Sequence, residues 1–245
     1  MADEFYVGYE GPPPPGMRRL VRRVVVAGLA VGLAAVAAAT TLQRRLEPAR
    51  FDFAAPTTVE GWLRLEPVPA LLVPGGRGVT VWWLVGPGKW SADRALGDVR
   101  SGWVRLDGKI IERGSWHMLE VVPGTARAIS PGTPPPASAP VAERSVRLTG
   151  ELVDGKCYLG VMNPGERTVH RDCATRCLSG GVPAFFAFRD AAGARRLALV
   201  LGADGRPAGP RLASLAGTPV TLEGRLATTG GADVLIVAPM ARPRP

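Results

Sequence analysis

All three cysteines of this chain lie in one segment, together with one of its two histidines. Cys157 comes first, and the others follow as His170-x2-Cys173-x3-Cys177. Residues 169–178 are predicted to form a short helix that stops at the next glycine pair. Positions i, i+3 and i+7 of a helix lie on one face, so the imidazole and the two later thiols would point the same way. Cys157 would complete the set from the end of the preceding strand.

Three thiolates and one imidazole around a point form a tetrahedral Cys3His site, the kind that structural zinc occupies. The predicted metal ligands are therefore Cys157, His170, Cys173 and Cys177. The predicted cofactor is a transition metal, with zinc first. Copper and iron also accept thiolate-rich ligands, so the ligand types do not fix the metal.

Two other interpretations of the cysteines stay open. Thiols outside the cytoplasm tend to oxidise, so Cys157 could form a disulfide with Cys173 or Cys177 and leave one thiol over. Thiol redox chemistry is less favoured, because the chain has no C-x-x-C pair. Three nearby acidic residues are either solvent-exposed or hydrogen-bonded partners of the imidazole: Glu151, Asp154 and Asp172.

The elements that carry this segment are predicted to be short strands. Glycine (31 residues) and proline (24 residues) interrupt the chain too often for long helical bundles. Short runs of alternating apolar and polar residues, some with a glycine in mid-strand, fit small OB-like barrels. We therefore expect an all-β fold with an N-terminal transmembrane helix and two tandem OB-like small β-barrels, the second with a short inserted helix. A small β-sandwich is the alternative.

The two halves of the chain also resemble each other. Residues 104–110 (VRLDGKI) match residues 220–226 (VTLEGRL), and residues 81–86 align with residues 197–202 at the same spacing. This indicates two copies of one β module. The second copy has extra residues before its third strand, and this insertion contains every cysteine.

Composition divides the chain further, because a stretch rich in proline, alanine and serine separates the two modules. The predicted parts are a cytoplasmic tail (1–17), a transmembrane anchor (18–43), a first OB-like module (51–129), a linker (130–144) and a second OB-like module with the Cys/His insertion (145–241).

The uncharged run from Val24 to Leu42 is long enough to cross a membrane, since a helix of this length reaches about 28 Å. The basic residues at its ends are Arg18, Arg19, Arg22 and Arg23 before it and Arg44, Arg45 and Arg50 after it. This arrangement favours a single-pass protein of the bacterial inner membrane, with a cytoplasmic N-terminus and periplasmic C-terminal domains. A signal peptide cleaved near residues 35–39 is the alternative.

The formal net charge is +9, but outside the ends of the apolar run the basic residues are scattered. Nucleic-acid binding needs a clustered basic surface, so no nucleic-acid partner is predicted. The sequence has no Walker A, G-x-S-x-G or H-E-x-x-H motif, and it assigns no enzymatic activity.

The stretch from Gly150 to Cys157, followed by H-x-x-C-A-x-x-C and then G-G-x-P, resembles a known pattern. It is similar to an uncharacterised small domain of exported bacterial proteins, in which a G-x-[IV]-[IV]-D-x-x-C strand precedes an H-x-x-C-A-x-x-C helix and OB-like strands. The resemblance covers about residues 146–240. It implies an extracytoplasmic setting and a metal-like site, and it brings no established reaction.

These observations predict a membrane-anchored extracytoplasmic protein whose second module binds a transition metal. Its predicted role is that of an accessory or assembly subunit of a membrane-bound, redox-type complex. The predicted partners are the lipid bilayer and a protein of that complex. The alternative is a metal-free binding or scaffold module with a structural disulfide.

If the run from Val24 to Leu42 is retained as an anchor, the full-length protein will stay in the membrane fraction after an alkaline wash. Immunoblotting of the washed membranes and of the soluble fraction measures this. Mature protein that begins near residue 40 and is found in the soluble periplasm would show that the run is a cleaved signal.

Overall fold

The computed structural model of the chain describes residues 14–43, 48–76, 78–130, 132–135, 141–229 and 232–238. The chain forms two compact units, Met1–Glu47 and Pro48–Pro245. Most of the predicted tail, Arg44 and Arg45, and much of the predicted linker lie outside the described residues.

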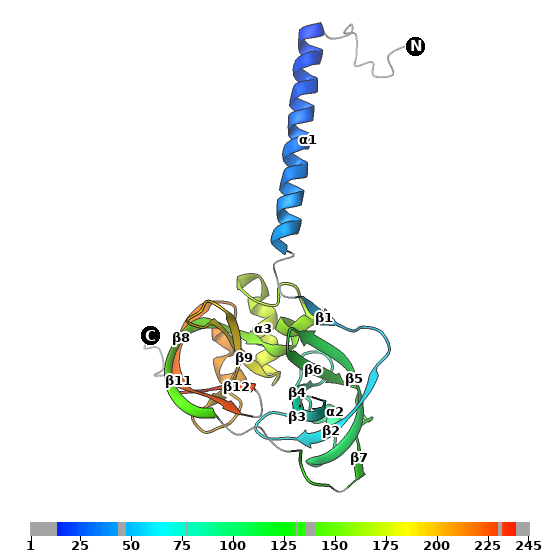
Figure 1. The fold of residues 1–245 in the computed structure, drawn as a ribbon, viewed down its shortest axis with the longest axis vertical. Helices are drawn as coiled ribbons and strands as arrows, with labels where there is room; N and C mark the ends of the chain where they lie inside the picture. Colours follow the sequence, from blue (N-terminus) through cyan, green and yellow to red (C-terminus); the bar gives the residue numbers. More distant parts are fainter. Residues whose placement is uncertain are drawn as a thin grey trace. The chain divides into compact units, whose positions relative to one another are not determined.

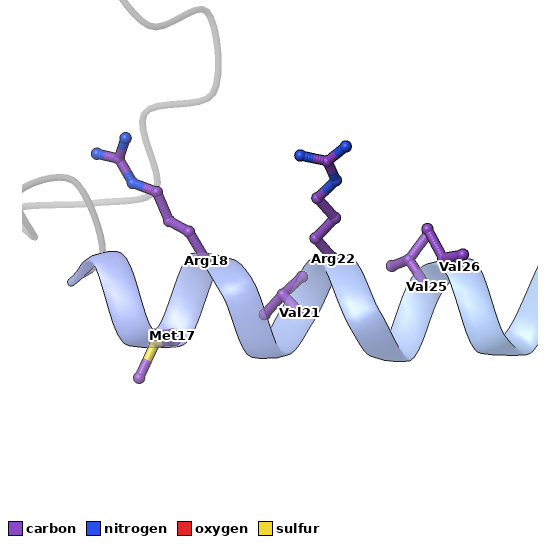
Figure 2. Close-up of a pocket in the computed structure, with 6 residues that line it drawn as sticks. All are labelled: Met17, Arg18, Val21, Arg22, Val25 and Val26. Atoms are coloured by element: carbon purple, nitrogen blue, oxygen red, sulfur yellow. The ribbon is translucent and has the colours of Figure 1, made fainter.

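The first unit contains one long helix, α1 (Pro15–Gln43). Its Pro15–Leu42 portion has a mean hydropathy of 2.2 in its most apolar window, with none of that window buried. By length and composition it can cross a membrane, although a signal sequence would have the same properties. Figure 2 shows Arg18 and Arg22 pointing to the same side, just before Val25 and Val26. The hollow that these residues line is the surface of a single helix.

The second unit begins with a closed five-stranded barrel (Figure 1). Its strands are β2 (Thr57–Arg64), β3 (Ala70–Gly75), β4 (Gly78–Val85), β5 (Gly102–Arg113) and β6 (Trp116–Val121). The spatial order is β2-β3-β4-β6-β5, and β5 closes the ring by pairing with β2. The β4–β6 pair is parallel. Two short strands, β1 (Ala49–Phe51) and β7 (Arg127–Ser130), pair with β5, and the short helix α2 (Asp93–Leu96) connects β4 to β5.

A second closed barrel follows, with the same strand order. Its strands are β8 (Val141–Asp154), β9 (Ala184–Arg189), β10 (Arg195–Gly202), β11 (Pro219–Thr229) and β12 (Ala232–Val237). Between β10 and β11 lie two short helices, α4 (Gly209–Leu212) and η3 (Ala213–Leu215). Between β8 and β9 lie the inserted segments η1 (Cys157–Val161), η2 (Thr168–His170) and α3 (Arg171–Ser179). The predicted fold class of two small barrels, with a short helix inserted in the second, is confirmed.

A glycine in the middle of one long strand lets each barrel close. Gly108 in β5 pairs on one side with β2 and on the other with β6. Gly224 in β11 pairs in the same way with β8 and β12. A Cβ atom would collide with the Leu119 side chain at the first position and with the Ile236 carbonyl oxygen at the second. Both are therefore places where two strands approach too closely for a side chain.

The two barrels share an apolar core. Phe185 of β9 is fully buried and lies edge-on to Trp83 at 5.7 Å and to Trp116 at 5.5 Å, both in the first barrel. Ile111 and Met118 of the first barrel belong to the same cluster. The barrels are thus joined by buried aromatic contacts as well as by the chain that connects them.

A buried ion pair crosses the same junction. Lys156, which follows β8, pairs with Glu120 of β6. Its ammonium group also donates to the carbonyl oxygens of Gly86, at 2.9 Å, and Gly88, at 2.7 Å. These three acceptors use all three N–H bonds of the ammonium group, so its charge is compensated on burial.

We predict that Phe185→Ala destabilises the first barrel as well as the second, by about 3–5 kcal/mol, because it opens a cavity against both tryptophans. All six tryptophans precede residue 117, so a change of their fluorescence during chemical denaturation follows the unfolding of the first barrel. Phe53→Ala is the matched control, since Phe53 is 71% exposed, and it should cost less than about 1 kcal/mol. A tryptophan-monitored transition that Phe185→Ala leaves in place would contradict the shared core.

Candidate metal centre

The three cysteines of the inserted segment lie on two separate helices, Cys157 on η1 and the other two on α3. β8 ends at Asp154, and the chain turns at once into η1, where Cys157 is buried. The helix predicted over residues 169–178 is present as η2 followed by α3. Cys173 and Cys177 lie one turn apart on α3, so their side chains fall on the same face. The helix ends where Gly180 N–H bonds the carbonyls of Arg176 and Cys177.

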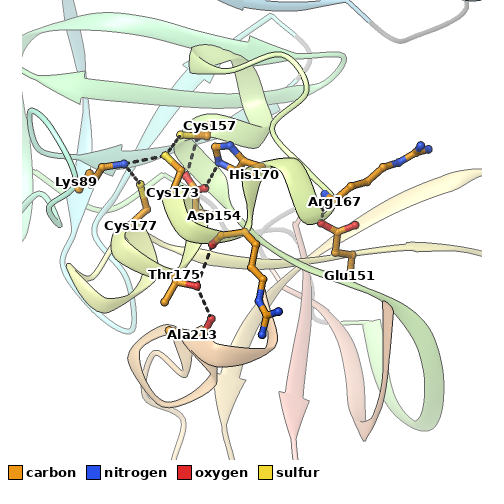
Figure 3. A network of polar contacts seen from close by, with 11 residues as sticks. Lys89, Glu151, Asp154, Cys157, Arg167, His170, Cys173, Thr175, Cys177 and Ala213 are labelled. Carbon is orange, nitrogen blue, oxygen red and sulfur yellow. Dashed lines mark hydrogen bonds and ion pairs between the residues drawn. The ribbon is translucent and has the colours of Figure 1, made fainter. Parts of the chain in front are cut away.

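The three sulfur atoms form a compact cluster (Figure 3). Cys157 Sγ lies 3.9 Å from Cys173 Sγ, and all three sulfurs are within 4.8 Å of one another. Cys157 and Cys177 are buried, Cys173 is half-buried, and all three are free thiols. The segment therefore brings together the three thiols that the sequence predicted as ligands.

His170, the fourth predicted ligand, lies beside this cluster and is bonded to Asp154. Asp154 Oδ2 is 3.0 Å from His170 Nε2, and Asp154 Oδ1 accepts the backbone N–H of Cys157 at 2.8 Å. Both side chains are buried. Because a carboxylate only accepts hydrogen bonds, Nε2 is the donor in this pair, and in the neutral imidazole Nδ1 then has the lone pair that can bind a metal. His170 forms a second potential metal-binding group with Asp154 and Cys157, so Cys157 belongs to both groups.

The structure also shows which of the three acidic residues near the cysteines is hydrogen-bonded to His170. Asp154 is the partner of His170 and has no exposed surface. Asp172 is exposed on α3. Glu151 is half-buried and accepts the backbone N–H of Arg167. The other histidine, His117, lies in the first barrel and stacks on Trp82 at 5.2 Å.

Lys89 of the first barrel also reaches the thiols, which the sequence analysis did not predict. Its Nζ lies 2.8 Å from Cys173 Sγ and 3.8 Å from Cys177 Sγ. The hydrogen bond to Cys173, together with the charges of the three cysteines, raises the pKa of Lys89 against an opposing effect of burial. The one signal in the sequence was that Lys89 is among only three lysines in a chain that otherwise uses arginine.

The thiols differ in how readily they lose their protons. The interaction with the neighbouring Cys177 sulfur raises the pKa of Cys157, and burial and the Asp154 charge raise it further. The same interaction lowers the pKa of Cys177 against the opposing effect of burial, and the positive charge of Lys89 lowers it further. Cys177 therefore loses its proton more readily than Cys157, and a thiolate is the form that binds a metal or attacks a disulfide.

This arrangement can hold a thiophilic metal ion or, after oxidation, a disulfide. It supplies three sulfurs, one imidazole nitrogen and a buried carboxylate that orients the imidazole. No family model, curated protein or solved structure matches the chain. The interpretation of the site therefore depends on its own geometry.

We predict that Asp154→Asn changes the proton position on His170. The new amide group would donate to Nε2, so the proton would move to Nδ1, and stability would fall by about 1–3 kcal/mol as the buried network is lost. Nitrogen NMR of histidine-labelled protein measures the tautomer, and the chain has only two histidines to assign. Asp172→Asn, at an exposed position nearby, should change neither property. An unchanged His170 tautomer in Asp154→Asn would refute the assignment.

Proposed function

We propose that the second barrel binds a transition metal ion through Cys157, Cys173, Cys177 and His170, and that zinc is the favoured metal. The observation that carries this proposal is the cluster of three free thiols within 4.8 Å of one another, with His170 grouped beside Cys157. Four protein ligands of this kind form a closed site, which is typical of structural zinc and leaves no position for a substrate. Copper or iron would use the same sulfurs.

The surroundings of the cluster fit a bound cation. Three thiolates carry more negative charge than a buried site can hold without compensation. A divalent ion supplies two of the three positive charges that would balance them. Asp154 fixes the imidazole with Nδ1 free to bind, as carboxylates do in many zinc sites. When bound, the metal would hold η1 to α3 in the way that a small cross-link does.

We also propose that α1 anchors the protein in the bacterial inner membrane, with both barrels on the periplasmic side. The apolar length of α1 and the arginines at its start support this topology. A closed metal site with four protein ligands leaves no position for a substrate, so an accessory or assembly role in a membrane-bound complex fits it better than an enzymatic one. That role makes the bilayer and one protein of the complex its partners, with no nucleic acid.

A second candidate function is a scaffold module with a structural disulfide. The observation that favours it is the 3.9 Å separation of Cys157 Sγ and Cys173 Sγ, which a small side-chain rotation could shorten to a bond. The resulting protein would hold no metal and would keep Cys177 as a free thiol.

Elemental analysis of the purified full-length protein tests the metal proposal, with one zinc per chain expected. Cys157→Ser, Cys173→Ser, Cys177→Ser and His170→Ala should each lose the metal, because each removes one of four ligands. The tryptophan-monitored unfolding transition should be kept in each variant, because all six tryptophans precede residue 117 and the ligands lie in the second barrel.

The disulfide candidate gives a different pattern. Two cysteine variants would be strongly affected, while the third and His170→Ala would be nearly silent. A metal-free wild-type protein with one intact bridge, counted by thiol titration under native conditions, would exclude the metal proposal.

A further inference from the structure

The thiol cluster lies where the two barrels meet, and part of its surroundings comes from the first barrel. Residues 86–91, which follow β4, form a loop over the C-terminal end of α3. Lys89 lies in this loop, and Figure 3 shows its ammonium group directed at Cys173 and Cys177. A residue far away in the sequence thus contacts two of the proposed ligands.

Main-chain contacts hold the loop in this position. The N–H of Ser91 donates to the carbonyl of Gly180 at 3.1 Å. Gly180 has no Cβ, and one built there would collide with the Lys89 carbonyl oxygen. On the other side, Lys156 donates to the carbonyls of Gly86 and Gly88. The approach of Lys89 to the sulfurs is therefore set by the backbone on both sides of it.

The ammonium group of Lys156, which precedes Cys157 in the sequence, cannot take over this role. All three N–H bonds of Lys156 are used by Glu120 and the two glycine carbonyls. Within the part of the chain that the structure describes, the polar contacts of the Lys89 ammonium group are the two sulfurs. Three thiolates around a divalent ion leave one negative charge uncompensated, and Lys89 is placed to neutralise it.

We propose that Lys89 is a positioning residue of the metal centre, which donates hydrogen bonds to the metal-bound sulfurs of Cys173 and Cys177. This inference rests on the proposed metal-binding function. It makes the centre a joint product of both barrels, because the second barrel supplies the ligands and the first barrel supplies the compensating charge. Hydrogen bonds to ligand atoms tune how strongly the ligands bind the metal and what electronic states the metal complex has.

The test uses the full-length protein in detergent, with Zn²⁺ and Co²⁺ as the probe metals. Lys89→Met should weaken Zn²⁺ binding by about 10–100-fold, the usual effect of losing a partner of a metal ligand. The thiolate-to-cobalt charge-transfer band should move to lower energy, because a sulfur without a hydrogen bond gives up its electrons more readily. Lys89→Arg keeps the charge and should restore most of the affinity. Lys109→Met, which removes a lysine charge elsewhere in the first barrel, is the control and should match the wild-type protein.

A second measurement covers the case in which Lys89→Met does not fold. The wild-type chain has only three lysines, so an amine-acetylating reagent followed by peptide mass analysis reports on each of them. Zn²⁺ should slow the acetylation of Lys89 and leave that of Lys109 unchanged. Slower labelling of Lys89 supports the proposal, and equal labelling with and without the metal overturns it.

The possible failures can be told apart. A wild-type protein that binds neither Zn²⁺ nor Co²⁺ overturns the metal-binding function, and this inference with it. A wild-type protein that binds one metal ion, while Lys89→Met keeps both the affinity and the charge-transfer spectrum, overturns the role of Lys89 alone. Equal losses in Lys89→Met and Lys109→Met would also overturn it, since the effect would then be one of overall charge.

Discussion

The packing of Phe185 against Trp83 and Trp116 joins the two barrels, and the thiol site depends on that junction. Cys157 and Cys177 belong to the same buried cluster as these aromatic rings, and Cys173 packs against it. The apolar contact that stabilises the interface therefore also removes water from the sulfurs. Without it, the loop that carries Lys89 would have no surface to lie on.

Burial creates the electrostatic problem that the polar residues around the site solve. An unpaired charge in such a place is expensive, and the charged groups nearest the sulfurs have specific partners. Asp154 bonds His170 and the backbone of Cys157, Lys156 bonds Glu120, and Lys89 bonds Cys173. The cluster is thus a set of matched polar contacts inside an apolar junction, which favours a single arrangement of the side chains.

Much of this could be predicted from local sequence patterns. The spacing of His170, Cys173 and Cys177 indicated a short helix with its ligands on one face, and that helix is present. The mid-strand glycines and short alternating runs indicated small barrels. Where a barrel closes, two strands approach too closely for a side chain, so glycine is required at Gly108 and Gly224. These features depend on neighbours along the chain, so one sequence is enough to show them.

The contacts between the barrels could not be predicted in this way. Lys89 is 84 positions away from Cys173, and no periodicity relates them. The choice of Asp154 over Asp172 depends on which of the two is buried, which is a property of the whole fold.

The same separation has a consequence for the order of folding. Closing a loop of this length costs entropy before any contact repays it, so contacts distant in sequence form late. The segment from Cys157 to Cys177 can form its helical turns early, but its thiols become buried only when the two barrels pack together. The time between these two events is a kinetic window in which metal capture and oxidation compete for the same sulfur atoms.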